Sequence, residues 1–141
     1  MSGDSRAYHH GDLRAALLEA GLLLARDGGI GALGLREATR SVGVTPSAAY
    51  RHFADLRALT FAVAEVTQQS LADAMKARID VEATSQDAAH RSVQRLRGAG
   101  LGYIDFAVTE PGWFELAILT HDANDDGPSV SATLAEPNAL T

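Results

Sequence analysis

Hydrophobic residues recur along this chain at the three- and four-residue intervals that are typical of amphipathic helices. The first run places Leu13, Leu17 and Leu24 on one face, and the glycine pair at 28–29 ends it. No stretch alternates regularly between apolar and polar residues, so we expect an all-α fold without a sheet. The predicted helices cover residues 10–27, 35–41, 46–53, a long stretch from Asp55 to beyond Met75, and 89–107, with a last apolar turn or two over 113–119.

The predicted fifth helix carries its apolar residues on one face. A polar stretch over residues 80–87 precedes this helix, and the Pro-Gly pair at 111–112 stops it. Three alternating glycines lie within it, and glycines inside a helix mark close packing or local weakness. The glycines are Gly98, Gly100 and Gly102, and the apolar face comprises Ala89, Val93, Leu96, Gly100, Tyr103, Ile104 and Ala107.

Two short predicted helices, joined by a turn that contains Gly43, occupy residues 35–53. This order is typical of a helix-turn-helix unit. Thr45 can cap the second helix, and Pro46 suits its first position, where a missing N–H costs nothing. Small and hydroxyl side chains follow at Ser47 and Ala48, and they would let this helix approach base edges in a major groove. An ordinary helical hairpin of an all-α domain has the same spacing, so the pattern alone leaves both interpretations open.

Net charge first argues against nucleic acid as a partner, because the 141 residues carry 12 basic and 18 acidic side chains, a formal charge of −6. The charge is uneven, however. Residues 1–60 contain seven arginines and six acids, whereas residues 61–141 contain five bases and twelve acids. The first part of the chain is therefore compatible with a polyanionic partner. The composition, 46% hydrophobic and 21% charged, is that of a globular protein.

Three segments of the first half resemble the DNA-binding domain of tetracycline-repressor (TetR) type transcriptional regulators. They are residues 10–14 (HGDLR), 35–44 (LREATRSVGV) and 49–53 (AYRHF), which occur in the order and at the spacing of that family. The resemblance covers residues 7–66. A weaker likeness, over 103–106 (YIDF) and 110–114 (EPGWF), is to the ligand-binding domain of one branch of the family.

The resemblance implies three regions: a helix-turn-helix DNA-binding domain over 7–66, a partial helical effector-binding domain over 67–120, and a polar tail over 121–141 that we expect to be loop or disordered. It also implies that the third helix enters the major groove and that the N-terminus of the fourth presents amides to a phosphate. Tyr50, Arg51 and His52 can also donate to phosphates. The predicted DNA-binding residues are Arg36, Thr45, Pro46, Ser47, Ala48, Tyr50, Arg51, His52 and Arg57.

Two positions depart from the family pattern. Leu56 stands where the family usually has a phosphate-binding lysine, and Arg57 is its candidate substitute, so we expect weakened DNA binding. Thr39 stands where alanine is more common, which predicts slightly strained helix packing.

Four aromatic residues, Tyr103, Phe106, Trp113 and Phe114, form the predicted ligand-binding group. Aromatic clusters in helical domains are also ordinary core, and the residue pattern alone leaves both interpretations open. The resemblance favours a pocket, because this region holds the effector in the family.

The sequence offers little support for a metal, cofactor or catalytic site. The chain has no cysteine, which excludes disulfides and thiolate sites. His9 and His10 with Asp12 fit solvated or phosphate-facing groups better than a metal site. The acids Asp122, Asp125 and Asp126 lack the spacing of a calcium loop. We therefore expect no metal, no cofactor and no enzymatic activity.

The combined expectation is a DNA-binding transcriptional regulator, a repressor whose affinity for double-stranded operator DNA is controlled by a small-molecule effector. Ligand binding would shift the fourth helix and release DNA. The family implies a homodimer, but its last two helices, which form the dimer interface, would lie beyond Leu119, so we expect a shortened dimerisation region. The absence of an apolar signal core or spanning run predicts a cytoplasmic protein without membrane contact. The alternative is a small helical ligand- or protein-binding module that has lost effective DNA binding.

Overall fold

The structure is a computed structural model that describes residues 10–120 and 129–130, and it confirms the all-α fold. A short 3-10 turn, η1 (Ile30–Ala32), follows the first helix. A two-residue antiparallel pairing, β1 (Leu119–Thr120) with β2 (Ser129–Val130), is a small departure from the expected absence of strands. The helices are α1 (His10–Gly28), α2 (Leu35–Val42), α3 (Pro46–Tyr50), α4 (Leu56–Glu82), α5 (Ala88–Thr109) and α6 (Pro111–Ala117).

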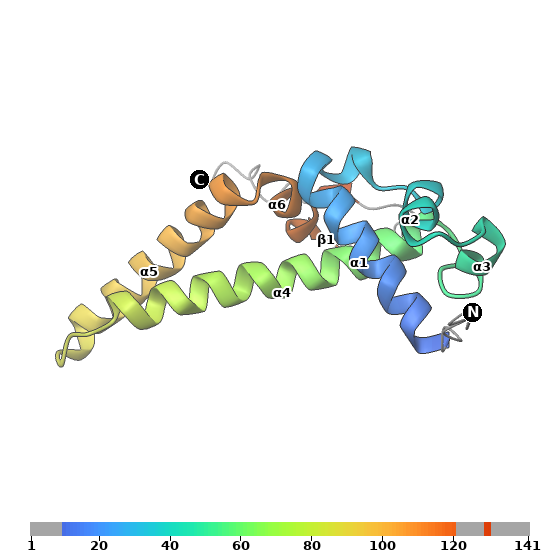
Figure 1. Cartoon of the computed structure of the whole chain (residues 1–141). Coiled ribbons are helices and arrows are strands. Elements are labelled where there is room, and N and C mark those ends of the chain that lie inside the picture. Colours follow the sequence, from blue (N-terminus) through green and yellow to red (C-terminus); the bar gives the residue numbers. More distant parts are fainter. Residues whose placement is uncertain (1–9, 121–128, 131–141) are drawn as a thin grey trace, which may run out of the picture.

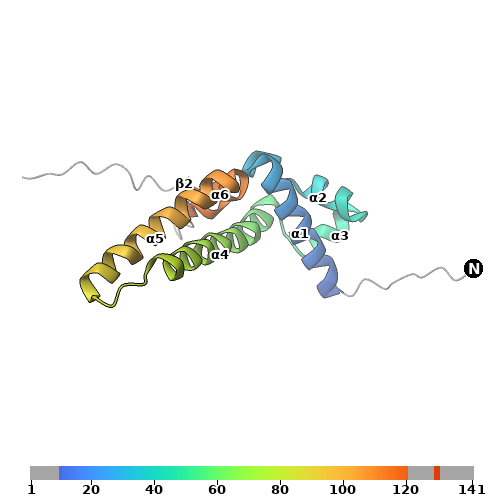
Figure 2. The ribbon, with the colours of Figure 1, turned by 60° about the vertical axis from the view of Figure 1, so that its left-hand side comes forward.

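The 27-residue helix α4 extends along the long dimension of the molecule (Figure 1). Its first half packs under α1, with α2 and α3 beyond, and its second half pairs with α5 (Figures 1 and 2). The short helix α6 then returns to contact both α1 and α4. Helix α4 packs against α1 with one half and against α5 with the other. The predicted domain boundary after residue 66 therefore falls inside a continuous helix.

The main hydrophobic core combines residues from both predicted domains. Leu17 of α1, Phe53 and Leu59 are almost fully buried, and Leu116 of α6 and Leu119 belong to the same cluster. A satellite cluster under α5 and α6 contains Leu71, Phe106 and Ala117. The described helices are thus joined by continuous apolar packing rather than by a flexible linker.

Helices α4 and α5 approach closely through two glycines. A Cβ added at Gly98 would lie 2.7 Å from the Cα of Ile79, and one added at Gly102 would lie 2.6 Å from the Cα of Met75. Any larger residue would push the two backbones apart. Gly100 does not take part in this close approach, since a Cβ added there would meet no atom within 4 Å.

The buried face of α5 is not the one that hydrophobicity predicted. Gly98, Gly102 and Phe106 are buried against α4, whereas Leu96 is 76% exposed and Val93 is 67% exposed. The two faces differ because periodicity finds the most apolar face, while close packing here selects the face with the smallest residues.

Two helix boundaries also differ from expectation. α3 ends at Tyr50 rather than at residue 53, and Arg51 and His52 form a turn in which both His52 and Phe53 donate N–H bonds to the carbonyl of Ala49. α4 extends into the first part of the polar stretch, to Glu82, so the break before α5 covers only 83–87. Most of the predicted tail, residues 121–128 and 131–141, lies outside the described residues.

Within the described part of the chain, no helix combines the length and hydrophobicity needed to cross a membrane.

Candidate nucleic-acid interface

Helix α2 has one buried face and one exposed, charged face. Ala38 and Thr39 are buried, while Arg36, Glu37 and Arg40 are exposed. The Thr39 hydroxyl donates to the carbonyl of Arg36 at 2.9 Å, so its polar group is satisfied within its own helix. The threonine therefore fits its buried position.

The turn after α2 depends on Gly43, which has φ 79° and ψ 32° in the left-handed region. Its N–H and that of Val44 both donate to the carbonyl of Thr39, at 2.9 and 3.0 Å. Glycine takes this conformation without steric cost. The turn thereby directs the chain into α3 at an angle to α2.

Helix α3 is anchored from one side and open on the other. Ala49 is fully buried against the core, whereas Ser47 and Tyr50 are exposed, Tyr50 at 57%. The N–H of Ala48 donates to the Thr45 hydroxyl oxygen at 3.4 Å, and Pro46 occupies the first turn, as predicted. The outer surface of α3 therefore presents small, hydroxyl and aromatic groups without a charge of either sign.

The start of α4 lies next to this surface in the chain. The N–H of Ala58 donates to the Asp55 carboxylate at 2.8 Å, which caps the helix. Leu56 is 43% exposed, and the guanidinium of Arg57 lies over the Phe61 ring, 5.3 Å from its centroid. Arg57 is thus partly held by an aromatic contact, and Leu56 adds no charge at this helix start.

The charge of this segment is positive. Residues 35–57 contain four arginines and two acids, a net charge of +2 within a chain of −6. Thr45, Pro46 and Arg51 are exposed, and Ala48 and His52 are half-buried, so all nine predicted DNA-binding residues lie on or close to the surface. Arg40, four residues after Arg36 on α2, is also exposed and was not among the predicted residues.

The four predicted ligand-binding aromatic residues lie where α5 meets α6. Phe106 is buried, and Tyr103 and Phe114 meet edge to face with 5.1 Å between ring centroids. Trp113 donates its indole N–H to the carbonyl of Leu22 at 2.8 Å. These four residues take part in packing. None of them lines either of the two hollows described next.

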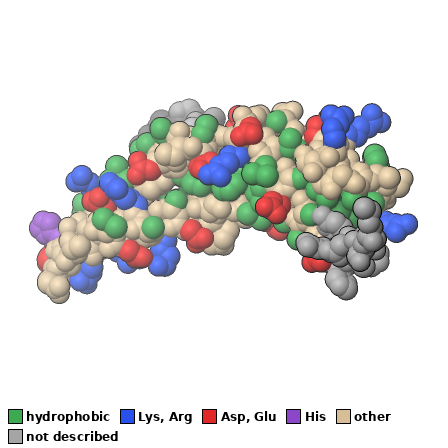
Figure 3. All heavy atoms as spheres, viewed as in Figure 1, with side chains coloured by type: hydrophobic (Ala, Val, Ile, Leu, Met, Phe, Trp, Pro, Cys, Tyr) green, Lys and Arg blue, Asp and Glu red, His purple; other side chains and the backbone are tan. Residues whose placement is uncertain are grey.

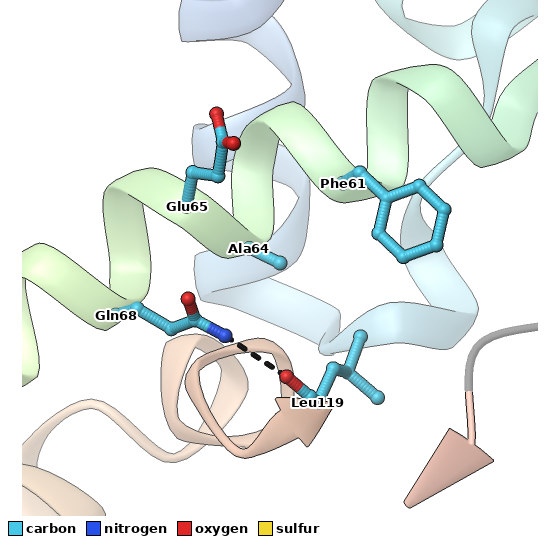
Figure 4. Close-up of a pocket in the computed structure, with 5 residues that line it drawn as sticks. All are labelled: Phe61, Ala64, Glu65, Gln68 and Leu119. Atoms are coloured by element: carbon cyan, nitrogen blue, oxygen red, sulfur yellow. Dashed lines mark hydrogen bonds between the residues drawn. The ribbon is translucent and has the colours of Figure 1, made fainter. Parts of the chain in front are cut away.

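A cavity of about 300 Å³ lies between α4 and β1 and is lined by Phe61, Ala64, Glu65, Gln68 and Leu119 (Figure 4). The Gln68 amide donates to the carbonyl of Leu119 at 2.9 Å, whereas Glu65 points away from that contact. A second, shallower groove of about 490 Å³ follows the outer side of α1 beside the end of α2.

Helix α6 is fastened to α1 by polar contacts as well as by the core. The Arg26 guanidinium donates to both carboxylate oxygens of Glu110, one of them at 2.7 Å. This hydrogen bond and the Arg26 charge lower the pKa of Glu110 below its ordinary value. The N–H of Ile30 donates to the Glu115 carboxylate at 3.0 Å. A Cβ at Gly112 would lie 2.2 Å from the carbonyl oxygen of Ala25, so only glycine fits there.

Among the described residues, no three His, Asp or Glu side chains gather as metal ligands would. His9, Asp122, Asp125 and Asp126 lie outside the described residues. No family model matches the chain, and no curated protein or solved structure was found to be similar to it.

Proposed function

We propose that this protein is a DNA-binding transcriptional regulator of the TetR type, with α2 and α3 as its helix-turn-helix. The observation that carries the proposal is the outer surface of α3, where Ser47 and Tyr50 are exposed without a neighbouring acid on the same helix. Arg36 on α2 and Arg51, which directly follows α3, are exposed and would contact phosphates. In this arrangement α3 lies in the major groove of a double-stranded operator, and the arginines fix its position on the duplex.

Control by a small-molecule effector forms the second part of the proposal. The cavity beside Phe61 and Leu119 is bounded by α4, the same helix that follows α3 in the chain. A ligand that separates α4 from the α6–β1 segment would therefore also move the helix that supports α3. The aromatic group of Tyr103, Phe106, Trp113 and Phe114, where α5 meets α6, stays the predicted ligand-binding group.

DNA binding is tested by selecting duplexes from a randomised double-stranded library and titrating the selected sequence by fluorescence anisotropy at several salt concentrations. We expect the selected duplex to bind at least about 10³-fold more tightly than a scrambled one, and the affinity to fall with salt as phosphate contacts require. Equal affinity for both duplexes would contradict sequence-specific regulation.

Two substitutions identify the surface. Arg36→Ala and Tyr50→Ala should each weaken binding roughly tenfold, the loss expected for one base or phosphate contact. Lys76→Ala is the matched control, because this exposed cation lies in the second half of α4 and pairs with Asp80 at 3.0 Å. If Lys76→Ala weakened binding as much as Arg36→Ala, the interface would lie elsewhere.

A second candidate is a helical binding module without DNA function. Leu56, 43% exposed at a position where a phosphate-binding cation is expected, is the observation that favours it. Absence of any duplex selected above the scrambled background would favour this candidate.

A further inference from the structure

The groove of about 490 Å³ beside α1 and the end of α2, which we call the α1 groove, combines apolar and acidic side chains. Among the described residues that line it, Glu19 and Asp27 carry charge, and both are acidic. Both are exposed, and Leu23, which lies between them on α1, is 57% exposed. The apolar part of the lining comprises Ala16, Ala20, Leu23, Leu24 and Val42.

The two carboxylates of the α1 groove lack a partner. Neither Glu19 nor Asp27 makes a hydrogen bond or an ion pair through its side chain with another described residue. The two arginines of α1 are engaged elsewhere, because Arg14 lies over an aromatic ring of the core, 5.0 Å from its centroid, and Arg26 pairs with Glu110. The groove therefore keeps its negative charge in the folded chain.

Cations are also scarce across the middle of the molecule. In the space-filling view, lysine and arginine side chains gather towards its two ends, over the α4–α5 hairpin and beside α2 and α3, whereas acidic and hydrophobic side chains occupy much of the middle (Figures 1 and 3). Arg40 precedes the groove residues of α2 and is exposed, but it does not line the groove. The α1 groove thus offers apolar surface in a negative local field.

The acids and the exposed leucine of the groove have a regular spacing. Glu19, Leu23 and Asp27 follow one another at intervals of four residues, which places them along one side of α1. At 1.5 Å per residue, the two acids are about 12 Å apart along the helix, with the leucine midway. A second helix laid along α1 matches this pattern when it carries a cation, an apolar residue and another cation at the same intervals.

We propose that the α1 groove is the docking site for a basic amphipathic helix of another protein. The apolar anchor of that helix packs against Leu23 and Leu24, and its lysines or arginines face Glu19 and Asp27. Charge complementarity selects this occupant, because an acidic helix would face two like charges. One helix in a shallow groove buries less than the roughly 1,200 Å² of a stable interface, so we expect a transient contact with a dissociation constant in the high micromolar range.

The remaining segments of this chain do not have the chemistry of that occupant. Residues 121–141 contain four acids and neither lysine nor arginine, and residues 1–9 contain one acid and one arginine. Neither segment repeats a cation at four-residue intervals. A separate basic helix therefore matches the α1 groove better than either end of the chain does.

The proposal is tested on the full chain without DNA, so its outcome is separate from that of the DNA-binding proposal. The probe is a fluorescent, alanine-based helical peptide that carries lysine, leucine and lysine at four-residue intervals. The control peptide has glutamate in place of each lysine. By fluorescence anisotropy at low salt, we expect the lysine peptide to bind roughly tenfold more tightly than the glutamate peptide, and the difference to shrink as salt is added.

Charge-reversal variants separate the groove from general attraction to an acidic protein. Glu19→Lys and Asp27→Lys should each weaken binding of the lysine peptide several-fold and strengthen binding of the glutamate peptide. Asp105→Lys is the matched control, because it makes the same charge change at an exposed position on α5 and should alter neither affinity by as much. Circular dichroism shows whether these surface variants keep their helices.

The apolar contact has its own pair of variants. Leu23→Ala should weaken binding of the lysine peptide several-fold, whereas Val81→Ala, at a residue of α4 that is 68% exposed, should leave it unchanged. In two-dimensional NMR spectra of the labelled protein, the largest peptide-induced changes should fall on residues 16–27, Ser41 and Val42.

Three results would overturn the proposal. Equal binding of the two peptides would show that charge does not select the occupant, and an equal effect of Asp105→Lys and Glu19→Lys would show that the attraction is not local. Failure of both peptides to bind, as a groove already covered by residues 1–9 or 121–141 would cause, would exclude an external helix.

Discussion

At the scale of single residues, the path from α2 into α3 depends on one backbone conformation. Gly43 lies at φ 79°, and both N–H groups that follow α2 reach the carbonyl of Thr39 only because the chain turns there. The space around Gly43 is open, so the requirement is conformational rather than steric. The sequence predicted this turn correctly because a glycine directly after a short helical pattern commonly adopts the left-handed conformation that ends the helix.

Gly43→Ala should therefore lower the free energy of unfolding by roughly 1–2 kcal/mol, the cost of left-handed backbone for an L-residue. Gly31→Ala is the control, because Gly31 is also surrounded by open space but lacks a positive φ. Urea denaturation followed by circular dichroism measures both. Equal effects of the two substitutions would show that the turn tolerates a side chain.

Leu56 offers a second residue-scale prediction, which rests on the proposed DNA binding. Leu56→Lys places a cation at the exposed start of α4 and should tighten binding several-fold, while the slope of log affinity against log salt becomes steeper by about 0.9. Val81→Lys adds the same charge to the other end of α4 and should change neither quantity by as much. An unchanged salt slope for Leu56→Lys would mean that this helix start does not approach a phosphate.

At the scale of elements, α5 shows how packing can override hydrophobicity. Its most apolar face points outward, and the face with Gly98 and Gly102 lies against the backbone of α4. A hydropathy pattern measures transfer from water, but it does not measure how closely two backbones can approach. Helix existence and approximate ends were predictable for α1, α2, α4 and α5, whereas the orientation of α5 about its axis was not.

Gly102→Ala should destabilise the protein by roughly 1–3 kcal/mol, because its Cβ would lie 2.6 Å from the Cα of Met75 and the helices would have to separate. Gly100→Ala on the same helix meets no atom within 4 Å and should be neutral or stabilising through helix propensity. Thermal unfolding at low protein concentration compares them. A harmless Gly102→Ala would contradict the close approach of α4 and α5.

At the scale of the whole molecule, α6 ties the end of the described chain to its beginning. Trp113, Glu110 and Gly112 all contact the last turns of α1, about ninety positions away in sequence. These contacts make the predicted two domains share one core. An effector bound beside α6 would therefore act on α1 as well as on α4.

The Arg26–Glu110 pair gives this connection a pH dependence. The pKa of Glu110 is lowered from its ordinary value of 4.5, so the ion pair contributes stability above that value and loses it as pH falls through the lowered pKa. Glu110→Gln should reduce the melting temperature by roughly 2–4 °C at neutral pH, and this difference should disappear once the pH has fallen below the lowered pKa of Glu110. Glu65→Gln removes the same charge from an exposed position on α4 and serves as the control. A Glu110→Gln difference that is independent of pH would show that the carboxylate charge does not matter.

Local sequence patterns were enough to predict the helical class, the caps at Thr45 and Asp55, and the exposed positions of Ser47 and Tyr50, because caps, turns and periodicity are local properties of the chain. The folded arrangement was needed to show which face of α5 is buried, that Trp113 donates to Leu22, and that Arg26 pairs with Glu110. These contacts join residues far apart in sequence, and their partners are selected by shape and close approach, which no local pattern encodes.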